Sequence, residues 1–83
     1  MTSPLTEIAP LLKVEITGLS IGDSHEEQEL ERRLLELGLV EGARVSVLHE
    51  GLFGRDPIVL LVDDARIAVR RAQASRIQVR AVD

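Results

Sequence analysis

Apolar and polar residues alternate through much of this 83-residue chain, and a two-residue period is typical of half-buried β-strands. The pattern predicts five short strands, over residues 12–19, 44–50, 58–62, 66–70 and 76–80. The side chains expected to face inward include Val45, Val47, Ile67 and Val69. Five short strands with one inserted helix favour a small, mostly β, partly open barrel.

One α-helix is predicted between the first two strands, over about residues 25–37. Three leucines follow the i, i+4, i+7 spacing that builds one buried helix face: Leu30, Leu34 and Leu37. At the start of the helix, Ser24 and Glu27 match a capping box. In that motif the serine hydroxyl accepts the N–H of the glutamate, and the glutamate carboxylate reaches back to the cap.

Glycines mark the places where the chain is expected to turn. Gly38 suits the left-handed C′ position after the helix, and Leu39 can supply the apolar contact typical of such caps. Gly42 is expected to turn the chain into the second strand. Gly54 lies in a predicted loop over residues 51–57.

The remaining segments are predicted to be short connections. Asp63 and Asp64 are expected to form a hairpin turn, and residues 72–75 a single helical turn. Residues 1–10 contain two prolines and are expected to be irregular, with Leu5 and Ile8 packing as a short turn.

Composition narrows the classes of function. A chain of 83 residues has room for one domain, over residues 1–83. Phe53 is the one aromatic residue, and the lack of cysteine excludes a disulfide framework, a thiolate metal site and a cysteine nucleophile. No apolar run approaches the roughly 20 residues of a membrane span, and no signal-peptide pattern is present. A cytoplasmic location is therefore expected.

The charge of the chain is −4 overall and is unevenly placed. Acidic residues crowd residues 23–31, whereas five arginines lie within residues 66–80. A nucleic-acid-binding domain usually carries a basic surplus, so nucleic acid is not an expected partner. The asymmetry suggests an acidic end and a basic edge that steer a protein partner, and charge that only keeps a small domain soluble is the simpler alternative.

No arrangement of residues predicts catalysis or a bound cofactor. No serine lies in a nucleophile-elbow pattern, and neither His25 nor His49 has a context that identifies a general base. The phosphate-binding G-x-x-x-x-G-K-[ST] motif is absent, and Lys13 is the only lysine. The chain is therefore not expected to be an enzyme.

One weak metal-binding pattern lies at the start of the predicted helix. His25, Glu26 and Glu29 share a helix face through their i, i+3 and i+4 spacing, and ferrous iron accepts imidazole and carboxylate ligands. Exposed polar residues are the favoured interpretation, because this spacing is loose and no supporting residues are evident.

A docking surface is a further prediction. Leu35 lies off the buried helix face, and Leu52 and Phe53 lie at a loop tip, where apolar side chains are poorly sheltered. The alternative is that Leu52 and Phe53 fold back as a lid over one mouth of the barrel. Arg70 and Arg71 are neighbours on a strand, so only one of them is expected to pack against the barrel.

Four segments of the chain form a set in order and spacing: RLLELGLVEG (residues 33–42), LFGRDPI (52–58), AVRRAQA (68–74) and IQV (77–79). Together they resemble the ferrous iron transport protein A (FeoA) family of SH3-like barrels. Residues 22–31 are more acidic and longer than is expected for this family. The resemblance implies a cytoplasmic accessory protein that docks on the cytoplasmic domain of FeoB, a ferrous iron transporter with a GTPase-like domain.

The resemblance, together with the exposed apolar positions, predicts which residues contact such a partner. They are Leu35, Leu39, Val40, Leu52, Phe53, Arg70 and Arg71. Two alternatives are an SH3-like module related to the C-terminal domain of iron-dependent repressors, and a weak metal carrier. An open barrel edge could also pair with a second copy of the chain, giving a weak homo-oligomer.

Overall fold

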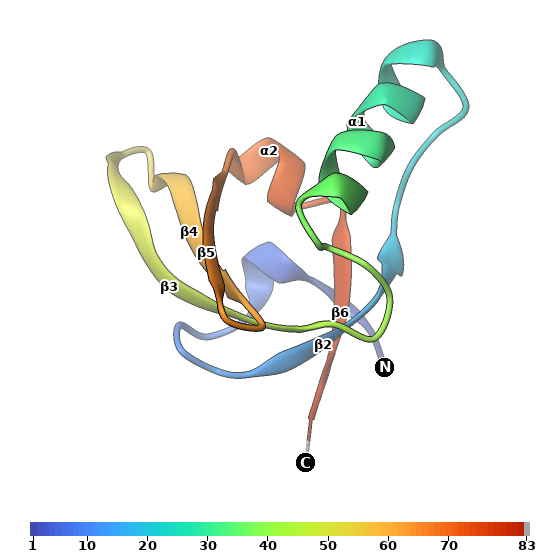
Figure 1. The fold of residues 1–83 in the computed structure, drawn as a ribbon. Coiled ribbons are helices and arrows are strands. Elements are labelled where there is room, and N and C mark those ends of the chain that lie inside the picture. The colour runs from blue at the N-terminus through green and yellow to red at the C-terminus, as the bar shows by residue number, and fades with distance from the viewer. Residues whose placement is uncertain (83) are drawn as a thin grey trace.

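Six antiparallel strands form a curved, partly open barrel in the order β1-β6-β2-β3-β4-β5 (Figure 1). The computed structural model describes residues 1–82, with the side chain of Phe53 left out. No helix in that range is long and apolar enough to cross a bilayer. The elements are β1 (Ser3–Pro4), the 3₁₀ helix η1 (Leu5–Glu7), β2 (Val14–Leu19), α1 (His25–Glu36), β3 (Arg44–Phe53), β4 (Asp56–Val62), β5 (Ala65–Val69), α2 (Arg71–Ala74) and β6 (Ile77–Ala81).

The predicted fold class is confirmed, with one strand more than expected. Residues 1–10 are not irregular, because Ser3 and Pro4 pair with Val79 and Gln78 of β6. The η1 turn that follows places Leu5 fully inside the core. A two-residue strand shows no alternation, so the sequence pattern could not reveal β1.

The core is built almost entirely from aliphatic side chains. Alternate strand residues face inward, as predicted for Val45, Val47 and Val69, and Ile67 packs against the core while remaining partly exposed. The buried apolar residues are Leu5, Val14, Ile16, Leu34, Leu39, Ala43, Val45, Val47, Ile58, Leu60, Val62, Val69, Ala74, Ile77 and Val79.

The hairpin of β3 and β4 corrects the predicted loop over residues 51–57. Both strands extend into that segment, leaving Gly54 and Arg55 as the turn. Gly51 lies within β3, where the register between β3 and β4 shifts between Glu50 and Phe53. A Cβ added there would lie 2.0 Å from the Asp56 carbonyl oxygen, so the glycine permits a close approach of the two strands. The glycines predicted for turns, Gly38, Gly42 and Gly54, have φ values of 92°, 91° and 66°.

The start of α1 is joined to the turn before β6 by hydrogen bonds and an ion pair. Ser24 Oγ accepts the Glu27 N–H at 3.1 Å, as predicted. The carboxylate of Glu27 does not return to the cap, because its Oε1 accepts the Gly22 N–H at 3.0 Å and its Oε2 accepts from Arg76 Nη2 at 2.9 Å. Arg76 Nη1 also donates to the Ser20 carbonyl at 3.0 Å. The acidic first turn of α1 is therefore joined through Glu27 to Arg76, an arginine 49 positions away in the chain.

This pairing changes the ionisation of both side chains. Hydrogen bonds from the Arg76 guanidinium, followed by that from the Gly22 N–H, lower the pKa of Glu27, and the Glu27 carboxylate in turn raises the pKa of Arg76. A lowered carboxyl pKa means that the folded state binds the proton less readily than the unfolded state. The resulting stabilisation is therefore complete above the unfolded pKa and is lost as pH falls through the folded pKa.

We expect Gly51→Ala to destabilise the domain severely, because the added Cβ would collide with the backbone of Asp56. The free energy of unfolding should fall by at least about 2 kcal/mol, which lowers the melting temperature by roughly 10 °C for a domain of this size. Gly18→Ala is the matched control, since a Cβ there meets nothing within 4 Å. Thermal unfolding followed by circular dichroism measures both, and equal melting temperatures for the two variants would contradict the prediction.

We expect Glu27→Gln to lower the melting temperature at pH 7 and to make folding less sensitive to acid. The difference between the unaltered chain and the variant should be constant above about pH 4.3, the usual pKa of a glutamate, and should shrink below it. Melting temperatures measured between about pH 7 and about pH 2.5 test this. Glu26→Gln, at an exposed position on the same turn of α1, is the control. A difference for Glu27→Gln that persists unchanged at low pH would argue against the role of the ion pair.

Candidate docking surface

At the end of α1, some leucine side chains lie in the core and their sequence neighbours are exposed to solvent. The Gly38 N–H donates to the Leu35 carbonyl at 3.0 Å, and the Leu39 N–H donates to the Leu34 carbonyl at 3.1 Å. With the positive φ of Gly38, these two bonds form a Schellman motif. The chain reverses there, and Leu39 joins Leu34 in the core, both fully buried. The predicted glycine cap is confirmed, and Leu39 lies in the same core cluster as Leu34.

Three apolar side chains remain outside this reversal and are here named the α1-end cluster: Leu35, Leu37 and Val40. Their side chains are 43%, 38% and 42% exposed. Because they come from one short stretch with a hydrogen-bonded backbone, they are held in place without a partner. An exposed apolar cluster on a small soluble domain often marks an interaction site.

Two predictions at this site are wrong. Leu39 was expected on the docking surface and is fully buried, while Leu37 was expected on the buried helix face and is exposed. The physical reason is that α1 ends at Glu36, so Leu37 occupies the C-cap and leaves the helical period. Gly38 then turns Leu39 into the core position that Leu37 would have filled. Leu37 directly precedes a C′ glycine in the sequence, and this position could have revealed that Leu37 ends the helix and leaves its buried face.

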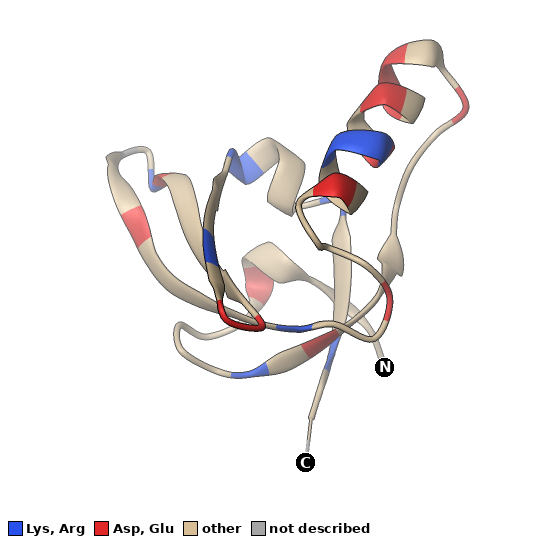
Figure 2. Ribbon diagram, viewed as in Figure 1, with Lys and Arg blue, Asp and Glu red and all other residues tan. Residues whose placement is uncertain are grey.

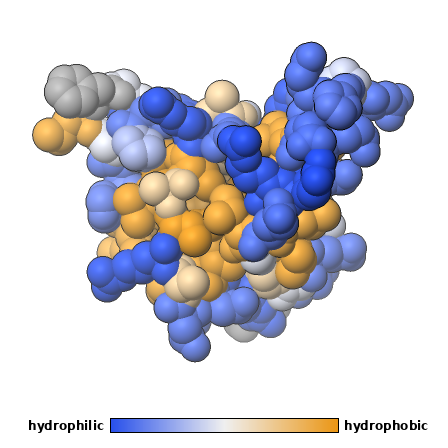
Figure 3. All heavy atoms as spheres, turned by 45° about the horizontal axis from the view of Figure 1, so that its top comes forward, coloured by the Kyte–Doolittle hydropathy of each residue, from blue (hydrophilic) through white to orange (hydrophobic). Residues whose placement is uncertain are grey.

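The tip of the β3–β4 hairpin carries a second exposed apolar residue. Leu52 is 94% exposed, so its side chain does not close a mouth of the barrel and the lid alternative is wrong for this residue. The side chain of Phe53 lies outside the described part of the structure. In Figure 1 the hairpin tip and α1 stand on opposite sides of the upper end, with α2 between them. Figure 3 shows apolar surface between the hairpin and the polar surface of α1.

Arg70 and Arg71 differ in their surroundings, but not because they alternate on a strand as predicted: β5 ends at Val69, Arg70 is the N-cap of α2 and Arg71 begins that helix. Arg70 is exposed, whereas the Arg71 side chain is 26% exposed and pairs with the Glu50 carboxylate. The Arg71 backbone N–H donates to Asp56 Oδ1 at 2.7 Å, and its Nη2 donates to the Arg55 carbonyl at 3.3 Å. Arg71 therefore joins the hairpin to α2, and Arg70 is the more accessible of the two arginines.

The arginine-rich last quarter of the chain does not form a continuous basic edge. Acidic residues gather on α1 and the segment before it, whereas basic residues are spread over several elements (Figure 2). Three of the arginines are used inside the fold, in the pairs Arg71–Glu50, Arg76–Glu27 and Arg80–Glu15. Arg66 and Arg70, on and just after β5, remain exposed, and neither is ion-paired within residues 1–82.

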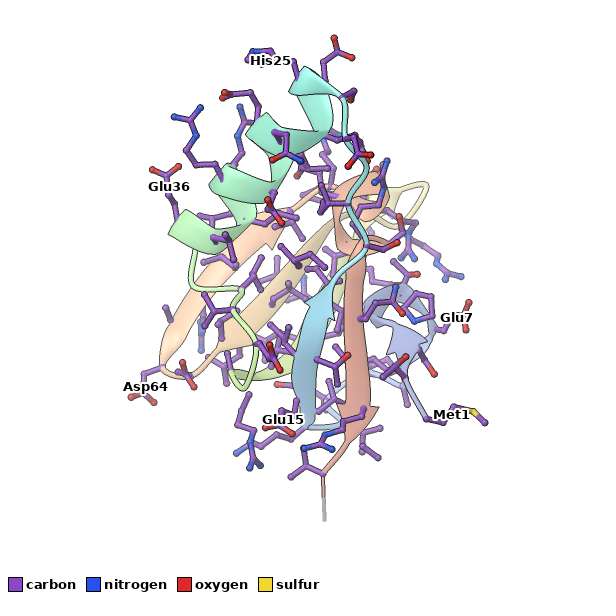
Figure 4. All side chains as sticks on the ribbon, turned by 90° about the vertical axis from the view of Figure 1, so that its right-hand side faces the viewer. Met1, Glu7, Glu15, His25, Glu36 and Asp64 are labelled. Carbon is purple, nitrogen blue, oxygen red and sulfur yellow. The ribbon has the colours of Figure 1, made fainter. Side chains whose placement is uncertain are left out.

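The candidate metal ligands His25, Glu26 and Glu29 stay on the surface. Figure 4 shows His25 at the free end of α1, pointing away from the barrel. The shallow hollow that the three residues line also contains the cationic Arg33, and the Glu29 carboxylate pairs with Arg32. Across the described residues, no three His, Asp or Glu side chains are grouped as metal ligands.

The chain matches the family model of the FeoA domain over residues 3–81. No curated protein matches it. Among solved structures it is similar to Stenotrophomonas maltophilia FeoA complexed with zinc, described as a procaryotic SH3 domain protein. The two are 32% identical over 96% of this chain and 89% of that chain, with a TM-score of 0.73.

Two further solved structures are similar to this chain. The solution structure of FeoA from Chlorobium tepidum is 30% identical over 96% of this chain and 70% of that chain, with a TM-score of 0.80. The repressor IdeR of T. acidophilum is 20% identical, with a TM-score of 0.76 over 98% of this chain but 34% of its own length. The likeness to IdeR concerns the fold alone, and the present chain spans about a third of that repressor.

Proposed function

Because this chain belongs to the FeoA family, we propose that it is a non-enzymatic accessory protein of ferrous iron uptake that docks on the cytoplasmic domain of a FeoB-type transporter. FeoA proteins are small, SH3-like and associated with ferrous iron transport, and they are not a known family of enzymes. The proposal goes further by assigning a partner and a surface to this chain.

The observation that carries the proposal is the α1-end cluster. Its three exposed side chains lie where the backbone is fixed by the Schellman motif, so little conformational entropy is lost when a partner covers them. The exposed Arg33, Glu36 and Glu41 lie on the same stretch of chain and supply a polar rim. An apolar centre with a polar rim is the usual composition of a protein–protein interface.

Leu52 supports a second point of contact. Leu52 is 94% exposed on the hairpin tip, so it adds little apolar burial to the fold of the free chain. Its burial against a partner would contribute much more free energy to binding. Arg70 is exposed at the N-cap of α2, after both the hairpin and α1 in the chain, and can pair with an acidic group. A protein that contacts its partner at two separated points can favour one conformation of that partner, and this mechanism needs no chemistry of its own.

The repressor-type module is the alternative supported by a specific observation, the shared barrel of IdeR. The two hypotheses differ in the partner, since a repressor-type module would act on a DNA-binding protein. A weak metal carrier is a third class, for which direct titration with ferrous iron is the test. Micromolar binding that is lost in His25→Ala would favour the carrier over docking.

We expect the soluble GTPase-containing portion of a FeoB-type transporter to shift the backbone amide signals of residues 35–40 and of Leu52 in the isotope-labelled chain. Leu35→Asp, Val40→Asp and Leu52→Asp should each weaken binding by about tenfold or more, because a carboxylate would be desolvated in the interface. Their melting temperatures should stay close to that of the unaltered chain, since all three side chains are exposed.

Leu11→Asp is the matched control. Leu11 is 70% exposed in the connection before β2. In Figure 1 that connection lies at the lower end of the barrel, away from α1 and the hairpin tip. Binding should be unchanged in this variant. Docking at the proposed surface would be rejected if the transporter portion, with and without nucleotide, left residues 35–40 and Leu52 unshifted, or if Leu11→Asp weakened binding as much as the other variants.

A further inference from the structure

The two edges of the sheet are protected to very different degrees. The β1 edge is two residues long and contains Pro4, which has no N–H to offer. The β5 edge is five residues long, with Ala65, Arg66 and Ala68 all exposed. In Figure 1, β5 lies at the front of the open barrel with no other element in front of it. An open strand edge is a template for pairing with another strand.

The hydrogen-bond alternation identifies the backbone groups that face outward from β5. Asp63, directly after β4, donates its N–H to a carbonyl of β3 at 3.0 Å. The preceding residue, Val62, therefore directs its bonds toward β5, where Ala65 is its register partner. Along β5 the same alternation turns the N–H and C=O groups of Arg66 and Ala68 away from the sheet. These groups are free to pair with a further strand.

The charges around this edge are complementary to those of the same segment running in the opposite direction. The segment is Asp63-Asp64-Ala65-Arg66-Ile67-Ala68-Val69-Arg70-Arg71. When two copies are laid antiparallel about Ile67, Arg66 lies opposite Ala68 of the second copy, and the outward groups of both residues meet. Asp64 then lies opposite Arg70, and this pair occurs twice because the arrangement is two-fold symmetric.

Other registers are disfavoured by charge or by geometry. Moving one strand by two residues places Arg66 opposite Arg66 in one direction, and Arg66 opposite Arg70 in the other. Like charges directly opposite each other destabilise a pair of strands. A shift of one residue would set outward-facing groups against residues that bond to β4. Among the registers within two residues of it, the one centred on Ile67 alone combines hydrogen bonding with charge complementarity.

We propose that β5 is a self-association edge, at which a second copy of this chain pairs antiparallel about Ile67 with Asp64 and Arg70 in contact across the interface. Figure 4 shows Asp64 at the outer corner of the β4–β5 hairpin, pointing away from the barrel. The proposal does not rest on docking to a transporter, because neither the α1-end cluster nor Leu52 takes part in the pairing. Five-residue strands bury less than a standard interface of about 1,200 Å², so the dimer is transient.

The first test is the mass and the amide spectrum of the isolated full chain at concentrations from about 10 µM to about 1 mM. Sedimentation should show a mass rising from 9.1 kDa toward that of two copies. The amide signals of Arg66 and Ala68 should shift with concentration, and their hydrogen exchange should slow. A constant mass up to the highest concentration would overturn the proposal, and so would concentration-dependent shifts confined to the α1-end cluster.

Charge exchange tests the register. Asp64→Arg and Arg70→Asp should each weaken self-association by about tenfold, because each sets like charges opposite each other at two places. The double variant should restore it, since the pairs are then present with their charges exchanged. Glu7→Arg makes the same change of charge at an exposed position on η1 and should leave association unchanged. Failure of the double variant to restore association would refute this register.

Ala68→Pro provides a test that does not depend on charge. Its N–H points away from β4, so the proline removes a donor from the open edge without removing a hydrogen bond of the sheet. Self-association should be lost while the melting temperature stays close to that of the unaltered chain. Undiminished association of a folded Ala68→Pro variant would show that β5 is not the contact.

Discussion

The placement of α1 depends on two leucines buried in the core, Leu34 within the helix and Leu39 just beyond it. Leu34 is the single buried residue of the 12 in α1, and the rest of the helix is largely charged. Burying a leucine contributes about 1.5–3 kcal/mol, and the partly buried Leu30 of α1 packs against the same core. The Glu27–Arg76 pair then joins the other end of the helix to the turn before β6.

The burial of Leu34 and Leu39 on either side of Gly38 also decides which residues are available to a partner. Gly38 reverses the chain tightly enough for Leu39 to enter the core, and the backbone bonds of that turn leave Leu35, Leu37 and Val40 outside. Exposure of these side chains is therefore a consequence of capping the helix. A docking surface produced in this way is rigid in the free chain, and rigidity reduces the entropic cost of binding.

The α1-end cluster and Leu52 take no part in the β5 pairing, so these docking contacts can coexist with it, whereas Arg70 can serve only one of the two contacts at a time. A dimer formed through β5 would carry two copies of the α1-end cluster. Two linked sites can bind an oligomeric partner more tightly than either site alone. The arginines divide accordingly: Arg71, Arg76 and Arg80 hold the fold together, while Arg66 and Arg70 stay exposed beside the open edge.

Local pattern was enough to determine the fold class, the helix with its Ser24 and Gly38 caps, and the family. Alternation and capping involve residues only a few positions apart, so they can be recognised without knowing the fold. Tertiary structure alone decided that β3 continues past Gly51, that Ser3 and Pro4 pair with β6, and that Leu39 rather than Leu37 is buried. It also decided that Glu27 pairs with Arg76, 49 positions away. Each of these outcomes depends on which distant segment occupies the neighbouring space, and no local period carries that information.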